Sequence, residues 1–243
     1  MTSFHPVARY YDELMDGVPY RMWAGYYLLL LSHQDIHPET ILDVCCGTGR
    51  MCELLTEEGF KLSGFDISEP MIREARRKAA KNKLDIRYEV ADAASFEMGE
   101  TYDAAFSFFD SLNYITDPSR LASAIKQVGK HLKPGGSFVF DLNTAYAFEA
   151  SLFNQKQLTN KRKLRYEWTG DWNPESRLIH VHMKFWKGDE EFEEMHVQRA
   201  YSDEEIWAML KDAGFAEVRA FHSYTLNPPR YKSDRVHYAC MKC

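Results

Sequence analysis

Short apolar runs alternate with segments of helical periodicity between residues 40 and 142, and this alternation restricts the chain to few folds. The apolar runs span residues 40–46, 61–66, 84–92, 102–110 and 137–143. Helical segments precede or separate most of them, at residues 19–34, 49–59, 68–83 and 118–136. Strands that alternate with helices form a parallel sheet covered by helices on both faces. We therefore predict an α/β fold, with Ser68 capping one helix and Pro134 ending another.

The pattern changes after Asn143. Three segments with partial strand alternation follow, at residues 163–172, 177–188 and 191–201, without a helical segment between them. They predict an antiparallel hairpin or three-stranded sheet. A helix that begins at Ser202, with Glu205 in the capping-box position, and strands at 216–224 and 234–242 complete the chain. We expect one domain, residues 1–243, with a β-rich insertion at residues 150–200 that covers the site as a lid.

Composition excludes several classes of protein. The longest apolar run, Tyr26 to Leu31, is far too short to cross a membrane, and the N-terminus lacks the pattern of a signal peptide. A formal net charge of −6 argues against a general polyanion binder, so no nucleic-acid partner is expected. The five cysteines have no zinc or disulfide spacing, and no metal site is predicted. The default is a soluble, cytoplasmic protein.

The stretch "ILDVCCGTGR", residues 41–50, places two glycines between a strand and a helix. Such a turn brings backbone N–H groups close to a ligand, and Asp66 follows where an acidic residue binds ribose hydroxyls. Both dinucleotide and S-adenosylmethionine (SAM) sites share this geometry, and a turn without a ligand is the third possibility. Asp43 favours SAM, because its carboxylate would repel a pyrophosphate but suits an ammonium and a sulfonium. The sixth position of the dinucleotide fingerprint is Cys52 instead of glycine or alanine.

Further motifs follow in order along the chain. They are "LDVCCGTGR", "GFDISEPMI", "VADAASF", "LKPGGSFVFDLN" and "LKDAGFAEVRAF". With them the chain resembles the class I SAM-dependent methyltransferases, which implies a Rossmann-like sheet of seven strands with the last antiparallel. "ARYYDELMD" and "FFDSLNYI" are similar to small bacterial enzymes that include the amino-sugar N-methyltransferases, many of which carry a β insertion after the fifth strand. Cys45 and Cys46 depart from the small residues, often glycine, of the first motif.

The resemblance implies a role for individual residues. Asp43 and the backbone of Cys45, Gly47 and Gly49 would hold the methionine part of SAM, and Asp66 the ribose. The other expected cofactor contacts are Tyr11, Trp23, Thr48, Ile67, Met71, Asp92, Ala93 and Phe108. Plainer readings remain open, because Asp66 and Asp92 can be loop acids, Phe108 a core residue and Tyr11 a helix cap.

The expected function is SAM-dependent methyl transfer to a nitrogen or oxygen of a small molecule. Alternatives are an RNA or protein methyltransferase, or a SAM- or dinucleotide-binding module without activity. Because the sulfonium is already activated, no fixed catalytic residue is required. Candidate bases are Tyr11, Asp110, His196, His180 and His182. The three histidines fall on the inserted strands, where an ordinary strand residue is the favoured reading, and His180 and His182 share one face that can line a pocket.

Aromatic residues are frequent in the insertion, which lacks every feature that SAM needs. They include Trp168, Trp172, Phe185 and Trp186. We predict that the insertion contacts the methyl acceptor while the α/β body binds the cofactor. The alternative is that these aromatic side chains only pack the insertion onto the body or form a contact in a homodimer.

Overall fold

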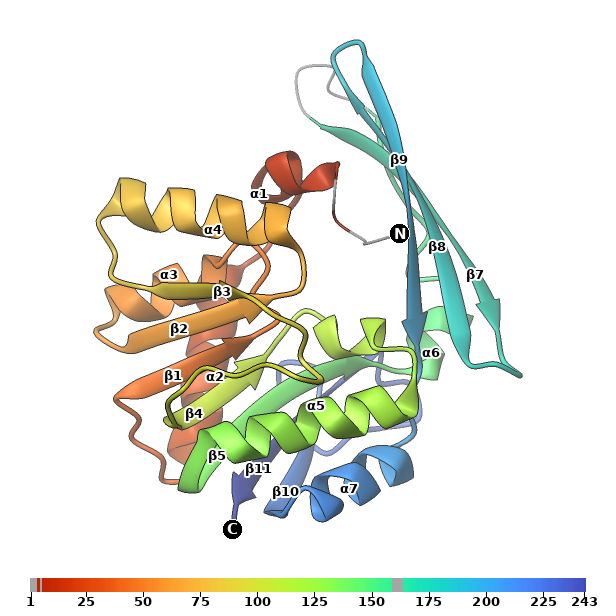
Figure 1. The fold of residues 1–243 in the computed structure, drawn as a ribbon. Helices are drawn as coiled ribbons and strands as arrows, with labels where there is room; N and C mark the ends of the chain where they lie inside the picture. Colours follow the sequence, from red (N-terminus) through yellow and green to blue (C-terminus); the bar gives the residue numbers. More distant parts are fainter. Residues whose placement is uncertain (1–3, 5, 159–163) are drawn as a thin grey trace.

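A seven-stranded sheet forms the body of the protein in the computed structural model, which describes residue 4 and residues 6–158 and 164–243 (Figure 1). Its strands are β1 (Thr40–Val44), β2 (Lys61–Asp66), β3 (Arg87–Val90), β4 (Tyr102–Ser107), β5 (Leu132–Asn143), β10 (Phe215–His222) and β11 (Arg235–Lys242). Their order across the sheet is β10-β11-β5-β4-β1-β2-β3. Strand β11 runs antiparallel to both neighbours. The predicted sheet, with its last strand antiparallel, is confirmed.

Helices cover both faces of this sheet. On one face lie α2 (Tyr20–His33), α3 (Arg50–Glu57) and α4 (Glu69–Asn82), and on the other α5 (Pro118–His131) and α7 (Asp203–Asp212). Each face has its own hydrophobic core, because neighbouring residues of a buried strand point in opposite directions. In β1, Ile41 joins the core under α2–α4, whereas Leu42 joins the core under α5 and α7. No helix among the described residues is long and apolar enough to cross a membrane.

Some of the helix ends predicted from the sequence are confirmed and others are not. Ser202 and Glu205 form the predicted capping box, in which the Ser202 N–H donates to Glu205 at 2.8 Å. Ser68 stands at the N-cap of α4, but its side chain makes no capping hydrogen bond. The prediction that Pro134 ends α5 is wrong, because the helix ends at His131. Leu132 is already buried and extended, pairing with Tyr102 of β4, so the strand begins before the proline.

The insertion forms a second sheet of four antiparallel strands, which extends away from the body (Figure 1). Its strands are β6 (Gln155–Gln157), β7 (Arg165–Asn173), β8 (Leu178–Lys187) and β9 (Glu190–Arg199), and the short helix α6 (Ala145–Glu149) precedes them. The three predicted strands are present, and β6 is an addition. Part of the segment before β7, residues 159–163, lies outside the described residues. Val181, Met183 and Phe185 of β8 lie buried on the inner face of this sheet.

A short N-terminal segment lies between the insertion and α4 (Figure 1). It contains a 3-10 helix, η1 (Val7–Tyr10), and a single turn, α1 (Tyr11–Leu14). Asp12 accepts a hydrogen bond from Thr48 Oγ1 of the body and forms an ion pair with Lys78 Nζ of α4, both at 2.6 Å. The next residue, Glu13, instead pairs with Lys187 of β8 at 2.6 Å. The segment is therefore anchored on both sides.

Candidate functional site

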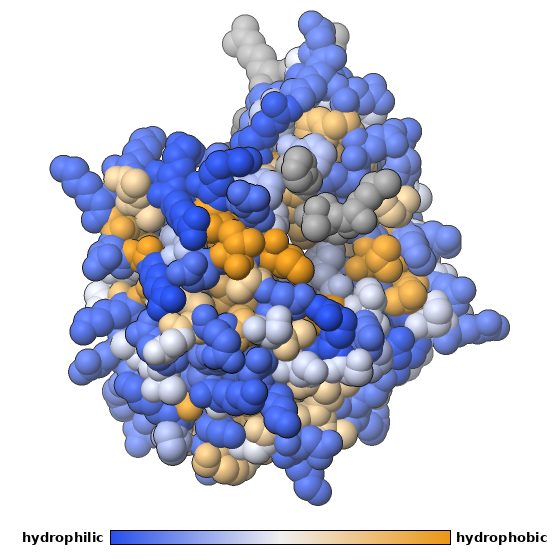
Figure 2. All heavy atoms as spheres, in the orientation of Figure 1, coloured by the Kyte–Doolittle hydropathy of each residue, from blue (hydrophilic) through white to orange (hydrophobic). Residues whose placement is uncertain are grey.

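A cavity of about 980 Å³ opens where the parallel strands end, between the body, the N-terminal segment and the inner face of the insertion. This edge of an open α/β sheet is where ligands bind, and the volume lies at the upper end of the range for small-molecule sites. Figure 2 shows hydrophobic side chains beside a hollow in this face, and Ile67, Leu152 and Met195 are exposed residues of that kind lining the cavity. The predicted site residues that line it are Tyr11, Trp23, Asp43, Cys45, Gly47, Thr48, Asp66, Ile67, Met71, Asp92, Ala93, Phe108, Asp110 and His196.

Gly49 does not line the cavity, although it belongs to the predicted loop. Its φ of +74° is left-handed, and a Cβ built there would lie 2.2 Å from the hydroxyl of Tyr88. Gly47 has a φ of +54° with open space around its Cβ position, and it faces the cavity. The two glycines therefore have different roles, because Gly49 is required by packing whereas Gly47 leaves room for a ligand.

Substituting each glycine by alanine separates these roles. Both variants incur the left-handed backbone cost of about 1–2 kcal/mol. Gly49→Ala also forces Tyr88 aside, and such overpacking adds about 1–3 kcal/mol. Urea unfolding should therefore show a clearly larger loss of stability for Gly49→Ala than for Gly47→Ala. Equal losses would mean that Tyr88 moves freely and that the contact does not explain Gly49.

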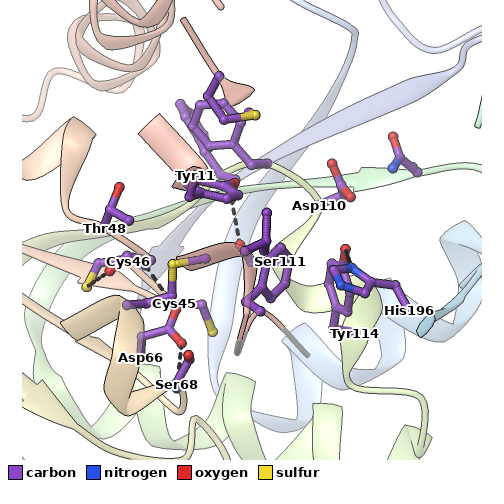
Figure 3. Close-up of a pocket in the computed structure, with 18 of the residues that line it drawn as sticks. Tyr11, Cys45, Cys46, Thr48, Asp66, Ser68, Asp110, Ser111, Tyr114 and His196 are labelled. Atoms are coloured by element: carbon purple, nitrogen blue, oxygen red, sulfur yellow. Dashed lines mark hydrogen bonds between the residues drawn. The ribbon is translucent and has the colours of Figure 1, made fainter. Parts of the chain in front are cut away.

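An acidic residue ends β2, and another follows β3 by two positions, as predicted. The Asp66 carboxylate accepts the N–H of Gly47 at 2.9 Å and of Ser68 at 2.8 Å, which fixes it at the cavity wall beside Cys45 (Figure 3). Burial raises the pKa of Asp66, while those hydrogen bonds oppose the shift. Asp92 accepts the N–H of Ala94 at 2.9 Å and pairs with Arg120. Both carboxylates accept backbone hydrogen bonds from the loops around them, and both also line the cavity.

Asp43 at the end of β1 is nearly completely buried, and it still lines the cavity. The Cys52 thiol donates to its carboxylate at 3.2 Å. Burial raises the pKa of Asp43 from its ordinary 3.8 to about 8, and the nearby Asp66 carboxylate adds to the rise. A cation placed in the cavity would stabilise the ionised form, so the donor set suits a ligand that carries an ammonium or a sulfonium.

The raised pKa of Asp43 predicts how stability depends on pH. The folded protein retains this proton up to about pH 8, whereas the unfolded chain releases it near 3.8. The stabilisation from this group is therefore complete below 3.8 and is lost as pH rises through about 8, at no more than about 1.4 kcal/mol per pH unit. Denaturant titrations at pH 6 and 8 should show a steeper loss of stability for the ligand-free wild type than for Asp43→Asn. Parallel losses would contradict the assignment.

Aromatic residues enclose the part of the cavity next to α2. Trp23 stacks on Tyr224 with ring centroids 5.0 Å apart, and it packs against Phe109 at 4.0 Å. The Trp23 Nε1 atom is buried without a hydrogen-bond partner. Trp23 therefore brings an apolar surface to the cavity wall, while its unpaired Nε1 atom lies buried. Tyr11 lies across the cavity, above Cys45 (Figure 3).

The opposite half of the cavity contains Asp110, Tyr114 and His196 (Figure 3). Asp110 is held in a left-handed conformation at the start of a 3-10 helix, η2 (Ser111–Tyr114), with a φ of 51°. Its carboxylate accepts from Gln198 Nε2 at 2.6 Å and pairs with Arg235 at 2.8 Å. Asp110 is thus already bound on both oxygens. Its role as a base remains a prediction, and the contacts suit a positioning role better.

Tyr11 is also a poor candidate base, although it lines the cavity. Burial raises its pKa well above the ordinary value, and the tyrosines and carboxylates around it reinforce the shift. The phenol therefore stays protonated at neutral pH and can donate or accept a hydrogen bond without first losing its proton. A contact role for Tyr11 is consistent with its position between the two halves.

His180 and His182 do not line the cavity, so the possibility that they line a pocket is ruled out and the favoured reading as ordinary strand residues fits them. They do share a face of β8, but it is the outer face of the insertion. His180 is exposed, and His182 pairs with Glu193 at 2.9 Å on the surface. Of the aromatic residues in the insertion, Trp168 and Phe185 line the cavity, whereas Trp172 packs on Phe148 and does not line it. Trp186 lies on the outer face as well.

Three residues at this site were missed by sequence reasoning. Tyr114, Arg235 and Glu194 contact His196 or Asp110 from three different elements. Glu194 and His196 are two residues apart on one strand, so their shared face was readable from the sequence. Nothing in the sequence alone links that strand to Tyr114, because the contact spans 82 positions.

Comparisons with known proteins agree with this geometry. A family model described as a methyltransferase domain matches residues 41–136. A Bacillus subtilis (strain 168) protein named "Putative methyltransferase YqeM" is 30% identical over 242 residues, covering 97% of this chain and 95% of the relative. The dTDP-3-amino-3,4,6-trideoxy-alpha-D-glucopyranose N,N-dimethyltransferase of Streptomyces venezuelae is 32% identical over 102 residues, covering 42% of this chain and 41% of the relative.

A solved structure extends the likeness to the whole fold. It is a SAM-dependent methyltransferase from Clostridium acetobutylicum ATCC 824, with a TM-score of 0.86 and 26% identity, covering 99% of both chains. The predicted enzyme class and cofactor are confirmed. Together with the near-full-length match to the B. subtilis relative, these findings mean that the chain belongs to the SAM-dependent methyltransferases.

Proposed function

We propose that this enzyme methylates a nitrogen or oxygen of a small-molecule acceptor. The observation that carries the proposal is one continuous cavity with two chemically different halves. The half beside β1–β3 holds Asp43, Asp66 and Asp92, and the half beside the insertion holds aromatic side chains around a few polar groups. A site of this composition suits a cationic cofactor beside a partly apolar acceptor.

In this proposal the cofactor occupies the acidic half. Asp43 and the Gly47 loop hold the amino-acid end, Asp66 the ribose, and Ile67 and Asp92 the adenine. Bound SAM supplies a methyl group on a sulfonium, which is an activated leaving group. Tyr11 and Trp23 exclude water at the boundary between the halves, which favours transfer from a charged donor.

The insertion supplies the wall of the acceptor half, and we assign it the role of a lid within a single domain. Trp168, Met183 and Phe185 present an apolar surface to the cavity, while Tyr114 and Asp110 supply polar atoms. Such an enclosed wall suits a small molecule better than a polymer. The name of the S. venezuelae relative, an amino-sugar N,N-dimethyltransferase, motivates amines as the first acceptors to test.

Calorimetry and a turnover screen test the proposal in two stages. S-adenosylhomocysteine should bind to the purified protein and NAD should not, because the cluster of Asp43, Asp66 and Asp92 suits an ammonium and disfavours a pyrophosphate. A screen of amine and hydroxyl compounds should then reveal SAM-dependent product by mass spectrometry. Binding without turnover of any acceptor, combined with methylation of RNA or protein, would refute the small-molecule assignment.

A further inference from the structure

Three side chains form a hydrogen-bonded row that ends at the acceptor half of the cavity. His196 Nε2 lies 2.6 Å from Glu194 Oε2, and His196 Nδ1 lies 3.0 Å from the hydroxyl of Tyr114. Glu194 is 8% exposed and His196 only 1%, whereas Tyr114 is partly exposed and lines the cavity. The row therefore leads from a buried carboxylate, through an imidazole, to one hydroxyl at the cavity surface. Figure 3 shows two of its members, His196 and Tyr114, side by side.

The contacts of Glu194 determine the direction of these hydrogen bonds. Its two oxygens also accept the backbone N–H groups of Phe4 and Val7, each at 2.9 Å. Both oxygens of Glu194 therefore act as acceptors, so the hydrogen between Glu194 and His196 lies on His196 Nε2. Nδ1 of the neutral imidazole is then an acceptor, and the Tyr114 hydroxyl donates to it. The Gln198 side chain also hydrogen-bonds the Tyr114 oxygen, which leaves a second lone pair for a ligand in the cavity.

We propose that Tyr114, His196 and Glu194 form a proton relay that receives the proton released by the methyl acceptor. The inference rests on the proposed function. Methylation of a neutral N–H or O–H group leaves one surplus proton, because the positive charge of the donor is transferred with the methyl. The acceptor gives this proton to the Tyr114 oxygen as the hydroxyl proton passes to His196 Nδ1. Glu194 stabilises the resulting imidazolium, as the carboxylate does in a Ser-His-Asp triad.

Burial of these side chains favours proton transfer through Tyr114 over a stable phenolate. It raises the pKa of Tyr114, and the Asp110 carboxylate raises it further, so Tyr114 passes a proton on instead of storing charge as a phenolate. The ring of Phe4 covers His196 edge-on at 4.4 Å and excludes water from it. The N-terminal segment thus contributes to the relay in two ways: its N–H groups bind Glu194, and the Phe4 ring covers His196.

A second histidine–glutamate pair in the same sheet provides a matched control. His182 and Glu193 lie on β8 and β9 with Nε2 and Oε2 2.9 Å apart, but they are on the outer face. The test compares His196→Gln, Glu194→Gln and Tyr114→Phe with His182→Gln and Glu193→Gln, using an acceptor found in the turnover screen. In His196→Gln the new amide can still donate to Glu194 but cannot take up a proton. We expect kcat to fall roughly 10- to 100-fold in the inner variants, within the scale of general-base effects.

Two readouts distinguish a relay from a structural role. The KM for the acceptor and the affinity for S-adenosylhomocysteine should change less than threefold in His196→Gln, while both outer variants keep the wild-type kcat. A pH profile of kcat gives the second readout, because a relay predicts a loss of activity at acidic pH in the wild type that is absent in His196→Gln. The charged and titratable groups that face the relay are Glu194 on β9, Asp110 and Tyr114 at η2, Arg235 on β11 and Tyr11 on α1.

Nitrogen-15 NMR tests the relay without any acceptor. In the ligand-free wild type, His196 should be the Nε2–H tautomer, and Glu194→Gln should shift that resonance while His182 is unaffected. An Nδ1–H tautomer, or an unchanged kcat in folded His196→Gln, would overturn the relay. If no small acceptor is turned over, the proposed function fails instead, and the tautomer still decides whether the row can accept a proton from the cavity.

Discussion

Replacing Asp66 by alanine is expected to raise the dissociation constant for S-adenosylhomocysteine at least tenfold, and by about two to four orders of magnitude if both ribose hydrogen bonds are lost in full. The physical reason is the loss of two charge-assisted hydrogen bonds to the ribose, each contributing about 1.5–3 kcal/mol. The variant also frees the N–H groups of Gly47 and Ser68, which loosens the glycine loop. Isothermal titration calorimetry measures the affinity, and circular dichroism confirms the fold.

Asp103 offers a matched control for this variant. It also accepts backbone hydrogen bonds, from Glu39 and Thr40, and it pairs with Lys133, but it begins β4 and lies at the opposite end of the strands from the cavity. Asp103→Ala should therefore reduce stability without changing ligand affinity. An unchanged dissociation constant in Asp66→Ala, or an equal loss in Asp103→Ala, would remove Asp66 from the cofactor site.

Replacing residues 155–198 with a short Gly/Ser linker is expected to reduce kcat/KM for the acceptor by about a thousandfold or more. The deletion removes Trp168, Phe185 and His196 from the cavity and opens the acceptor half to water. Ligand affinity should fall less than in Asp66→Ala, because Asp43, Asp66 and Asp92 all remain. Some loss is expected, since the N-terminal segment loses its contacts with Glu194 and Lys187.

A surface variant controls for disturbance of the insertion itself. His180, His182 and Lys184 lie on the outer face of β8, so changing all three to serine should preserve transfer. If the linker variant folds but loses cofactor affinity as severely as Asp66→Ala, the insertion is part of the cofactor site, and the proposed division of labour is wrong.

The α/β body could be predicted well because its signals are local. Glycine or aspartate lies at the end of β1, β2, β3 and β4 or within three residues after it, and the helices between these strands have a clear apolar face. Asp43, Asp66 and Asp92 could be assigned to the cavity because the carboxyl ends of parallel strands meet at one edge. The role of Gly49 could not, since its partner Tyr88 comes from β3 and the contact depends on how the loop packs.

The insertion was harder to read, for two physical reasons. Strand β6 is short, polar and fully exposed, so it has no alternation to reveal it. The sequence around β8 does alternate, and the apolar residues Val181, Met183 and Phe185 indicate which face is buried. Applied to the neighbouring histidines, that parity would have placed His180 and His182 outside. The relay partners of His196 depend on tertiary contacts that no local pattern specifies.

Because the N-terminal segment is anchored on both sides, release of the cofactor and release of the product are expected to be linked. Asp12 and Glu13 are consecutive residues of one helical turn, yet the first binds the body and the second binds the insertion. The turn can leave its closed position only if both ion pairs break in the same movement. Exchange of the spent cofactor and escape of the methylated product then share one barrier, so their rates should rise together when salt weakens those pairs.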